Sequence, residues 1–182
     1  MDRFVLSALV QNHAGVLSRV SGLFSRRDFN IDSLTVGETE DPSISRMTIA
    51  VRGDEHTVEQ IQRQLEKLED VYSVRRVRPE SGVFRELALI KVSARSAKRA
   101  DVINIAKVFR ARVVDVSSDS LTVEVTGDTG KVDGLIGVLR PYGIAELART
   151  GLSALERGAQ AMSAGQASFL DRADVEEEEL GA

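Results

Sequence analysis

A short turn near the N-terminus has the residue types and spacing of an anion-binding site. It follows an apolar run over 4–10 and comprises Asn12, His13, Ala14, Gly15, Val16 and Leu17. A strand-to-helix turn of this kind presents unpaired backbone N–H groups and the positive end of the helix dipole. It can hold a small carboxylate or phosphate without any catalytic side chain. The residues therefore favour binding of a small anionic metabolite over catalysis.

Each residue type in the turn suits an amino-acid ligand. Asn12 carries an amide donor and an acceptor, so it can meet either the carboxylate or the ammonium. Gly15 has no Cβ and lets a ligand approach the backbone, where the amides of residues 14–17 would take the carboxylate. An apolar wall would come from Val16, Leu17 and Ile31. A purely structural interpretation stays open, because Asn at helix starts and Gly at turns are common everywhere.

The elements that must position this turn occur twice along the chain, in the order strand, helix, strand, strand, helix, strand. The first copy predicts strands at 4–10, 31–39, 44–52 and 71–77, with helices at 15–27 and from the N-cap Asp54. The second predicts strands at 86–94, 112–116, 121–126 and 144–149, with helices at 97–110 and 131–139. The first helix is expected to bury Val16, Leu17, Val20, Leu23 and Phe24. Two βαββαβ units predict an α+β protein with tandem ferredoxin-like domains at 3–79 and 85–158.

Only the first unit carries the turn chemistry. The corresponding turn of the second unit reads Ser93-Ala94-Arg95-Ser96, with neither Asn nor Gly. The strand over 31–39 should lie at a sheet edge, and it has few charges to protect it. Pairing of this edge with its own copy would give a two-fold homodimer. A site at the start of that strand would then lie at the dimer seam.

Composition narrows the class of protein. The 182 residues are 42% hydrophobic and 29% charged, which is typical of a soluble globular protein. No apolar run suggests a membrane span or a signal peptide, and the absence of cysteine fits a cytoplasmic protein. The net charge of −4 comes from the last twelve residues, which contain six acidic residues and one arginine. The chain from about Ser153 is small, polar and finally acidic, so we expect it to be largely disordered, with the disordered acidic tail itself over 159–182.

Two other functional classes find little support. The chain has two histidines far apart and no Ser-His-Asp or metal-ligand cluster, so no catalytic residue and no metal site is predicted. Gly127-x-x-Gly130-Lys131 shares only part of a phosphate-loop pattern, since its glycine spacing is short and Val132 follows. RNA-binding modules of the same topology need aromatic residues on the central strands, and 44–51 has none. Neither nucleic acid nor membrane is an expected partner.

Longer stretches resemble a known family. In the first unit they are Asn12-x-x-Gly15-Val16-Leu17-Ser18-Arg19-Val20, Gly22 to Arg27, Asn30-Ile31-x-Ser33-Leu34-Thr35-Val36 and Ser45 to Ile49. In the second they are Phe109 to Val116 and Gly127 to Lys131. Together they resemble the small, regulatory subunit of acetohydroxyacid (acetolactate) synthase, which begins with an ACT domain. The resemblance covers about residues 3 to 158.

This resemblance implies a function without catalysis by this chain. Small subunits of the family bind the catalytic subunit, raise its activity and confer feedback inhibition, usually by valine. Thiamine diphosphate, Mg²⁺ and FAD would belong to the catalytic subunit, at the head of valine, leucine and isoleucine synthesis, and no cofactor to this chain. The effector would sit between the ACT domains of two chains. There Asn12, Gly15, Val16 and Leu17 of one chain would meet Asn30 and Ile31 of the other, with His13 and Ala14 completing the turn.

Two positions depart from the family pattern, and one alternative function stays open. Asp28 stands where relatives often have glycine, and Asp tolerates the left-handed conformation. His13 occupies a variable position beside the site and is interpreted as an exposed loop residue rather than a pH sensor. The alternative is a free-standing ACT-type amino-acid sensor that acts on another partner. The preferred branched-chain amino acid also stays open, because one methylene supplies only about 1–3 kcal/mol of discrimination.

Overall fold

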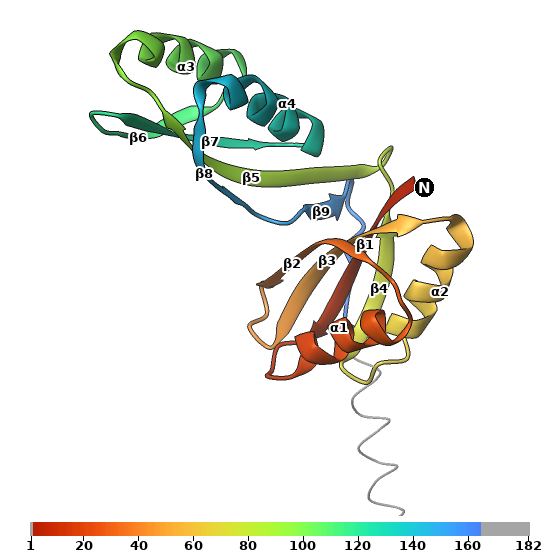
Figure 1. The fold of residues 1–182 in the computed structure, drawn as a ribbon. Coiled ribbons are helices and arrows are strands. Elements are labelled where there is room, and N and C mark those ends of the chain that lie inside the picture. Colours follow the sequence, from red (N-terminus) through yellow and green to blue (C-terminus); the bar gives the residue numbers. More distant parts are fainter. Residues whose placement is uncertain (1, 165–182) are drawn as a thin grey trace, which may run out of the picture. The chain divides into compact units, whose positions relative to one another are not determined.

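The computed structural model describes residues 2–164, which form two compact units. Unit 1 contains the described residues up to Gly82 together with those from Glu156 onward, and unit 2 contains Val83–Leu155. Each unit has the predicted order of strands and helices around an antiparallel sheet (Figure 1). The α+β class and the tandem ferredoxin-like folds are therefore confirmed. The acidic part of the predicted tail lies outside the described residues.

In unit 1 a four-stranded sheet carries two helices. Its elements are β1 (Asp2–Gln11), α1 (Val16–Arg26), β2 (Ile31–Glu38), β3 (Ile44–Gly53), α2 (Glu55–Leu65) and β4 (Val71–Val77). The strand order is β2-β3-β1-β4, and every neighbouring pair runs antiparallel. This order puts β2 at an edge of the sheet, as the sequence predicted.

Local signals in the sequence account for where the helices begin and end. Asp54 caps α2, because its carboxylate accepts a hydrogen bond from the Thr57 backbone N–H at 2.8 Å. Hydrogen bonds from Thr57 also lower the pKa of the Asp54 carboxyl. After α1, Asp28 takes the left-handed conformation at φ 57°, which few residues other than Gly, Asn and Asp adopt readily. The chain thereby turns out of α1 and enters β2.

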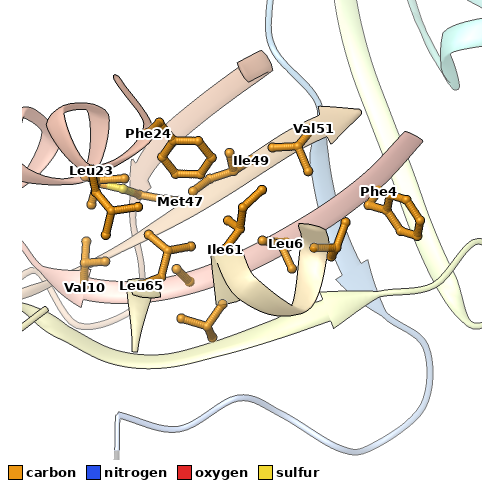
Figure 2. Packing of buried hydrophobic residues seen from close by; sticks show 14 of the residues in the cluster. Phe4, Leu6, Val10, Leu23, Phe24, Met47, Ile49, Val51, Ile61 and Leu65 are labelled. Atoms are coloured by element: carbon orange, nitrogen blue, oxygen red, sulfur yellow. The ribbon is translucent and has the colours of Figure 1, made fainter. Parts of the chain in front are cut away.

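One core of unit 1 lies between the sheet and its helices (Figure 2). Its largest fully buried side chains include Leu6 on β1, Ile49 on β3, Phe24 on α1 and Ile61 on α2. The predicted apolar face of α1 is correct for Val16, Val20, Leu23 and Phe24 but wrong for Leu17, which is 47% exposed. Leu17 follows Val16 by about 100° around the helix and so points away from the sheet.

The other face of the same sheet is also buried. Alternate residues of β1 and β3 outside the helix-side core are fully or almost fully covered: Val5, Ser7, Leu9, Thr48 and Ala50. Residues 156–164, which we call the C-terminal strap, contact this face. The Arg46 guanidinium reaches Ser7 Oγ at 2.8 Å and Met162 Sδ at 3.4 Å, and Ser73 Oγ donates to the Ser163 carbonyl at 3.3 Å. The sheet of unit 1 is therefore covered on both sides.

Unit 2 repeats the plan with a longer sheet. Its elements are β5 (Gly82–Ser93), α3 (Ser96–Val108), β6 (Arg112–Val116), β7 (Ser120–Gly127), α4 (Thr129–Leu139), a 3₁₀ turn (Arg140–Tyr142), β8 (Ile144–Arg149) and β9 (Ser153–Glu156). The strand order is β6-β7-β5-β8, and β9 also pairs with β5. Ile90, Val102, Leu121 and Leu135 are among its fully buried residues.

The start of β5 and the end of unit 2 differ from the sequence prediction. β5 begins at Gly82 rather than Glu86 because its first residues pair with β9. The chain from about Ser153 was expected to be disordered, yet Ser153–Glu156 form β9 and the strap follows. Leu152 and Ala154 are only 4% and 3% exposed. Burial of these two apolar side chains fixes the segment around β9, although its overall hydrophobicity is low.

Candidate effector-binding site

The turn before α1 presents unpaired backbone donors, as its sequence suggested. Gly15 is the N-cap residue of α1 at φ 96°, and no side chain caps this helix in the described structure. The first helical bond runs from the Arg19 N–H to the Gly15 carbonyl at 3.0 Å. Residues 16–18 therefore direct their N–H groups away from the helix. Because a Cβ at Gly15 would meet no atom within 4 Å, glycine is needed there for its backbone conformation rather than for space.

Asn12 braces the turn against two neighbouring segments. Its Nδ2 donates to the Pro42 carbonyl at 2.8 Å and to Glu38 Oε1 at 3.2 Å, while Ser45 Oγ donates to its Oδ1 at 3.0 Å. The sequence offered Asn12 as a helix cap or as a ligand group, and in the structure it does not cap α1. Both amide hydrogens are used, so only the second lone pair of Oδ1 remains for a ligand.

The turn over 39–43 supports Asn12 from the other side. The Asn12 backbone N–H donates to the Ser43 carbonyl at 2.7 Å. Ser43 in turn donates to the Asp41 carboxylate from its hydroxyl at 2.7 Å and from its backbone N–H at 2.9 Å. Both hydrogen bonds lower the pKa of the Asp41 carboxyl, and the bond from the Ser43 hydroxyl contributes more than the bond from the backbone N–H. An ionised carboxylate thus holds the loop on which Asn12 rests.

His13 is bonded at both ring nitrogens. Its Nδ1 lies 2.9 Å from the Ala14 carbonyl oxygen, and its Nε2 lies 3.1 Å from Asp70 Oδ1 and 2.9 Å from Gln11 Oε1. The ring is still 45% exposed, so the sequence was right about exposure but missed these bonds. Asp70 also escaped the sequence analysis. It lies 57 positions from His13, in a loop whose charged residues give no periodic signal.

Asn30 and Ile31 lie at the opposite end of β2 from Asn12. Asn12 reaches Glu38, the last residue of β2, whereas Ile31 is the first. At about 3.3 Å per residue the two ends of this strand are roughly 23 Å apart. A single chain therefore does not bring the two groups of predicted site residues together.

The Asn30 end of β2 borders an open cavity of about 770 Å³. Side chains of both charges line it, and they include Arg27, Arg52, Asp28 and Asp54. The Arg52 guanidinium also pairs with Asp32 at 2.6 Å, and this pairing raises the pKa of Arg52. Ile31 itself packs partly against the helix-side core. The cavity thus presents both charges beside an apolar strand end.

The corresponding turn in unit 2 has different geometry. Its N-cap residue, Arg95, has φ −67°, so the left-handed conformation of Gly15 does not recur there. The Arg99 guanidinium covers the turn and donates to the carbonyls of Ser117 and Ser118 at 2.5 and 2.7 Å. The left-handed N-cap residue before α1 in unit 1 thus has no counterpart at the corresponding turn of unit 2.

Across 2–164, no cluster of three or more His, Cys, Asp or Glu residues is arranged to hold a metal ion. In that same part of the chain, no helix has the length and apolar character that crossing a membrane requires.

Comparisons with known proteins agree with the sequence resemblance in both units. Residues 6–73 match the family described as the AHAS small subunit-like ACT domain, and residues 85–158 match the small subunit of acetolactate synthase. A probable acetolactate synthase small subunit of Methanothermobacter thermautotrophicus is 53% identical over 162 residues, covering 88% of this chain and 96% of that protein. The acetolactate synthase small subunit of Mycobacterium leprae is 50% identical over 153 residues, covering 84% and 90%.

A solved structure gives the same answer for the fold. The crystal structure of the acetolactate synthase small subunit from Thermotoga maritima superposes with a TM-score of 0.83 at 40% identity, covering 88% of this chain and all of that one. Both halves of the chain, its residues and its fold therefore lead to one assignment. The chain belongs to the family of acetolactate synthase small subunits, with an N-terminal ACT domain.

Proposed function

We propose that this chain is a regulatory subunit that binds the catalytic subunit of acetolactate synthase, raises its activity and transmits feedback inhibition by valine. Valine would bind at the seam of a homodimer formed by two ACT domains. Thiamine diphosphate, Mg²⁺ and FAD would be held by the catalytic subunit, in the cytoplasm. The observation that carries the proposal is the position of the predicted residues at opposite ends of one edge strand.

Pairing through the edge strand β2 would join two half-sites into one. One half-site is the turn over 12–17 near the end of β2, and the other is Asn30 and Ile31 at its start. If β2 pairs antiparallel with its copy about a two-fold axis, its first residues lie opposite the last residues of the partner strand. Asn30 and Ile31 of one chain then lie beside Glu38 of the other, where Asn12 is bonded. Such a dimer contains two equivalent sites, each built from both chains.

The two half-sites divide the chemistry of an amino acid between them. The free N–H groups at the start of α1 and the helix dipole suit a carboxylate. The partner's Asn30 and the acidic side chains near it suit an ammonium group. Leu17, which is 47% exposed beside Gly15, and Ile31 offer apolar surface for a branched side chain. We therefore favour a zwitterion with a small apolar side chain.

The match of unit 2 favours acetolactate synthase as the partner over a free-standing sensor with another target. Residues 85–158 match the small subunit of that enzyme specifically, whereas ACT domains occur with many partners. A regulator that binds an effector at one place and a catalytic subunit at another acts by shifting the population of two arrangements.

Calorimetric titration of the full chain with valine tests the site directly, with leucine, isoleucine and glycine as comparisons. We expect saturable binding of about one valine per chain, with Kd between about 1 mM and 1 μM, as for a ligand of this size. Assays with the catalytic subunit should show activation without valine and inhibition with it. Saturable glycine binding as tight as that of valine would contradict an apolar side-chain pocket.

Substitution of Gly15 separates its role in binding from its role in the backbone. Both Gly15→Ala and Gly15→Asp place a side chain at φ 96°, so both carry a strain of about 1–3 kcal/mol. Only the Asp variant adds a carboxylate where the effector's carboxylate would bind. We expect valine to bind at least about tenfold more weakly to Gly15→Asp than to Gly15→Ala, with activation of the catalytic subunit retained in both. Equal valine affinities would remove Gly15 from the site.

A further inference from the structure

The hydrogen bonds of His13 require two ring protons. Nδ1 faces the Ala14 carbonyl oxygen at 2.9 Å, and Nε2 faces the Asp70 carboxylate at 3.1 Å. A carbonyl oxygen and an ionised carboxylate can only accept hydrogen bonds. A neutral imidazole has one N–H and would point a lone pair at one of these oxygens. The observed arrangement is therefore complete only for the doubly protonated imidazolium.

Asp70 is the hub of this arrangement. It is 6% exposed, and its carboxylate accepts hydrogen bonds from Arg19 at 2.5 and 2.9 Å as well as from His13. Its backbone carbonyl accepts from the Gln11 N–H at 2.8 Å. One buried residue between α2 and β4 thus holds the end of β1, the turn and the first turn of α1 together.

Charged groups of several elements lie around His13. The Asp70 carboxylate faces Nε2, and the Arg19 guanidinium on α1 pairs with the same carboxylate. The Glu38 carboxylate at the end of β2 is bonded to Asn12, the residue before His13. The side chain of Gln11 on β1 can turn its amide to suit either form of the ring. The ring therefore lies within a cluster of charged and polar side chains.

We propose that Asp70 is the positioning residue of the effector turn and that it acts through a proton-sensitive bond to His13. This inference rests on the proposed function of the turn. Histidine is the side chain that most readily gains or loses a proton between about pH 5 and 8. When His13 is protonated, both of its bonds hold the backbone just before Gly15 and a positive charge lies beside the effector's carboxylate. When it is neutral, one bond is lost and the turn loosens. Valine should thus bind more tightly at lower pH.

Calorimetry on the full chain at pH 6 and pH 8 tests the linkage. For the unaltered chain we expect the Kd for valine to be at least about fivefold lower at pH 6, the lower end of typical coupling between two binding events. Titrations in two buffers of different ionisation enthalpy should show net proton uptake with each valine. His13→Gln and Asp70→Asn should both remove the pH dependence. Asp70→Glu, which keeps the carboxylate, should restore part of it.

Two controls separate this linkage from a general effect of pH or of folding. His56→Gln alters the other histidine, an exposed residue of α2, and should leave the pH dependence intact. His13→Gln alters a half-exposed side chain, so it serves if Asp70→Asn does not fold. A pH dependence that persists in His13→Gln would overturn the proposal, as would equal valine affinity at both pH values in the unaltered chain.

A measurement without ligand distinguishes failure of this inference from failure of the proposed function. Amide hydrogen exchange, corrected for the pH dependence of intrinsic exchange, reports whether the turn itself tightens. The Asn12 and Arg19 amides, which are bonded on either side of His13, should be more protected at pH 6 than at pH 8, and the difference should vanish in His13→Gln. This result without any valine binding would support the proton-sensitive turn and overturn valine as its effector. Unchanged protection would overturn the inference whether or not valine binds.

Discussion

At the scale of single residues, a buried carboxylate paired with arginine occurs in both units, at Glu86 in unit 2 and at Asp70 beside the turn before α1 in unit 1. In unit 2 the buried Glu86 accepts a hydrogen bond from Arg149 at 2.5 Å, and Arg149 also reaches Asp133 at 2.7 Å. The hydrogen bond from Arg149 to Glu86 is the main reason that the pKa of Arg149 is raised. In unit 1 the buried Asp70 is paired with Arg19 in the same way, but its other partner is a histidine, His13, in the turn before α1.

A surface pair of unit 2 should make stability depend on pH in a predictable direction. Lys91 Nζ donates to Glu146 Oε2 at 2.7 Å; this hydrogen bond, and then the charge of Lys91, lower the pKa of Glu146. A lowered pKa in the folded state adds stability above the ordinary glutamate value of 4.5, and this is lost as pH falls through the folded value. Glu146→Gln should therefore lower the urea midpoint slightly at pH 7, and the difference from the unaltered chain should shrink as the pH falls from 4.5 through the lowered folded-state pKa. Both side chains are exposed, so the effect is small.

A double-mutant cycle checks the cause of this effect. Lys91→Gln and the double variant should match Glu146→Gln at pH 7, because the pair is already broken in each. A double variant that loses the sum of the two single effects would mean that the residues act independently.

At the scale of elements, a charge added to the edge strand β2 should weaken the dimer, whereas the same charge added to the edge strand β6 should not. Val36 on β2 is 42% exposed and Val116 on β6 is 59% exposed, so each places an apolar side chain at an open edge. If β2 forms the dimer seam with Ile31 opposite Glu38 of the partner strand, Val36 lies opposite position 33 of that strand, so Val36→Lys places a charged side chain within the seam and should weaken the dimer at least about tenfold. Sedimentation equilibrium measures this directly, and valine binding should weaken in parallel.

Val116→Lys is the matched control for the seam. It adds the same charge at the edge of the other sheet, so the dimer and its valine affinity should be unchanged. Dissociation of the Val116→Lys dimer, with Val36→Lys intact, would assign the seam to β6 and remove the basis for a shared effector site.

Elements with strong local signals were predictable, and contacts made by small or distant residues were not. Asp54 marked the start of α2 and Asp28 the turn after α1, because caps and left-handed turns depend on a few neighbouring residues. The bond between His13 and Asp70 joins residues 57 positions apart and leaves no periodic pattern. Met162 and Ser163 lie in a polar stretch that resembles a disordered tail. The apolar run of β1, interrupted by Ser7 alone, is the pattern in this strand that indicates burial on both faces of the sheet.

At the scale of the whole molecule, the chain leaves unit 1 at Gly82 and returns to it at Glu156. Two contacts fix the start of the strap to the rest of unit 1. Arg75 pairs with Glu156 at 2.8 Å, and the Arg157 N–H donates to the Ser81 carbonyl at 2.7 Å. Unit 2 is therefore inserted within unit 1 rather than appended to it. The stability of unit 1 depends on residues made after unit 2.

Truncation should expose this dependence. Removal of residues 157–182 keeps β9 but uncovers the sheet face that contains Leu9 and Ala50, and we expect unit 1 to lose about 3 kcal/mol of unfolding free energy. Urea unfolding and binding of a hydrophobic dye measure the two effects. Removal of 165–182 alone is the control and should change neither, because every contact named for the strap lies before residue 165. Equal behaviour of the two truncations would mean that the strap does not stabilise unit 1.

The inserted arrangement also has a consequence for the growing polypeptide. When residues 1–82 emerge from the ribosome, the helix-side core of unit 1 can form, but the segment that covers its second face does not yet exist. Translation of the next roughly 75 residues takes about 4–15 s at ordinary rates of 5–20 residues per second. During that interval Val5, Leu9 and Ala50 face solvent on the nascent chain. Completion of the first domain therefore has to wait until the whole of the second has been translated.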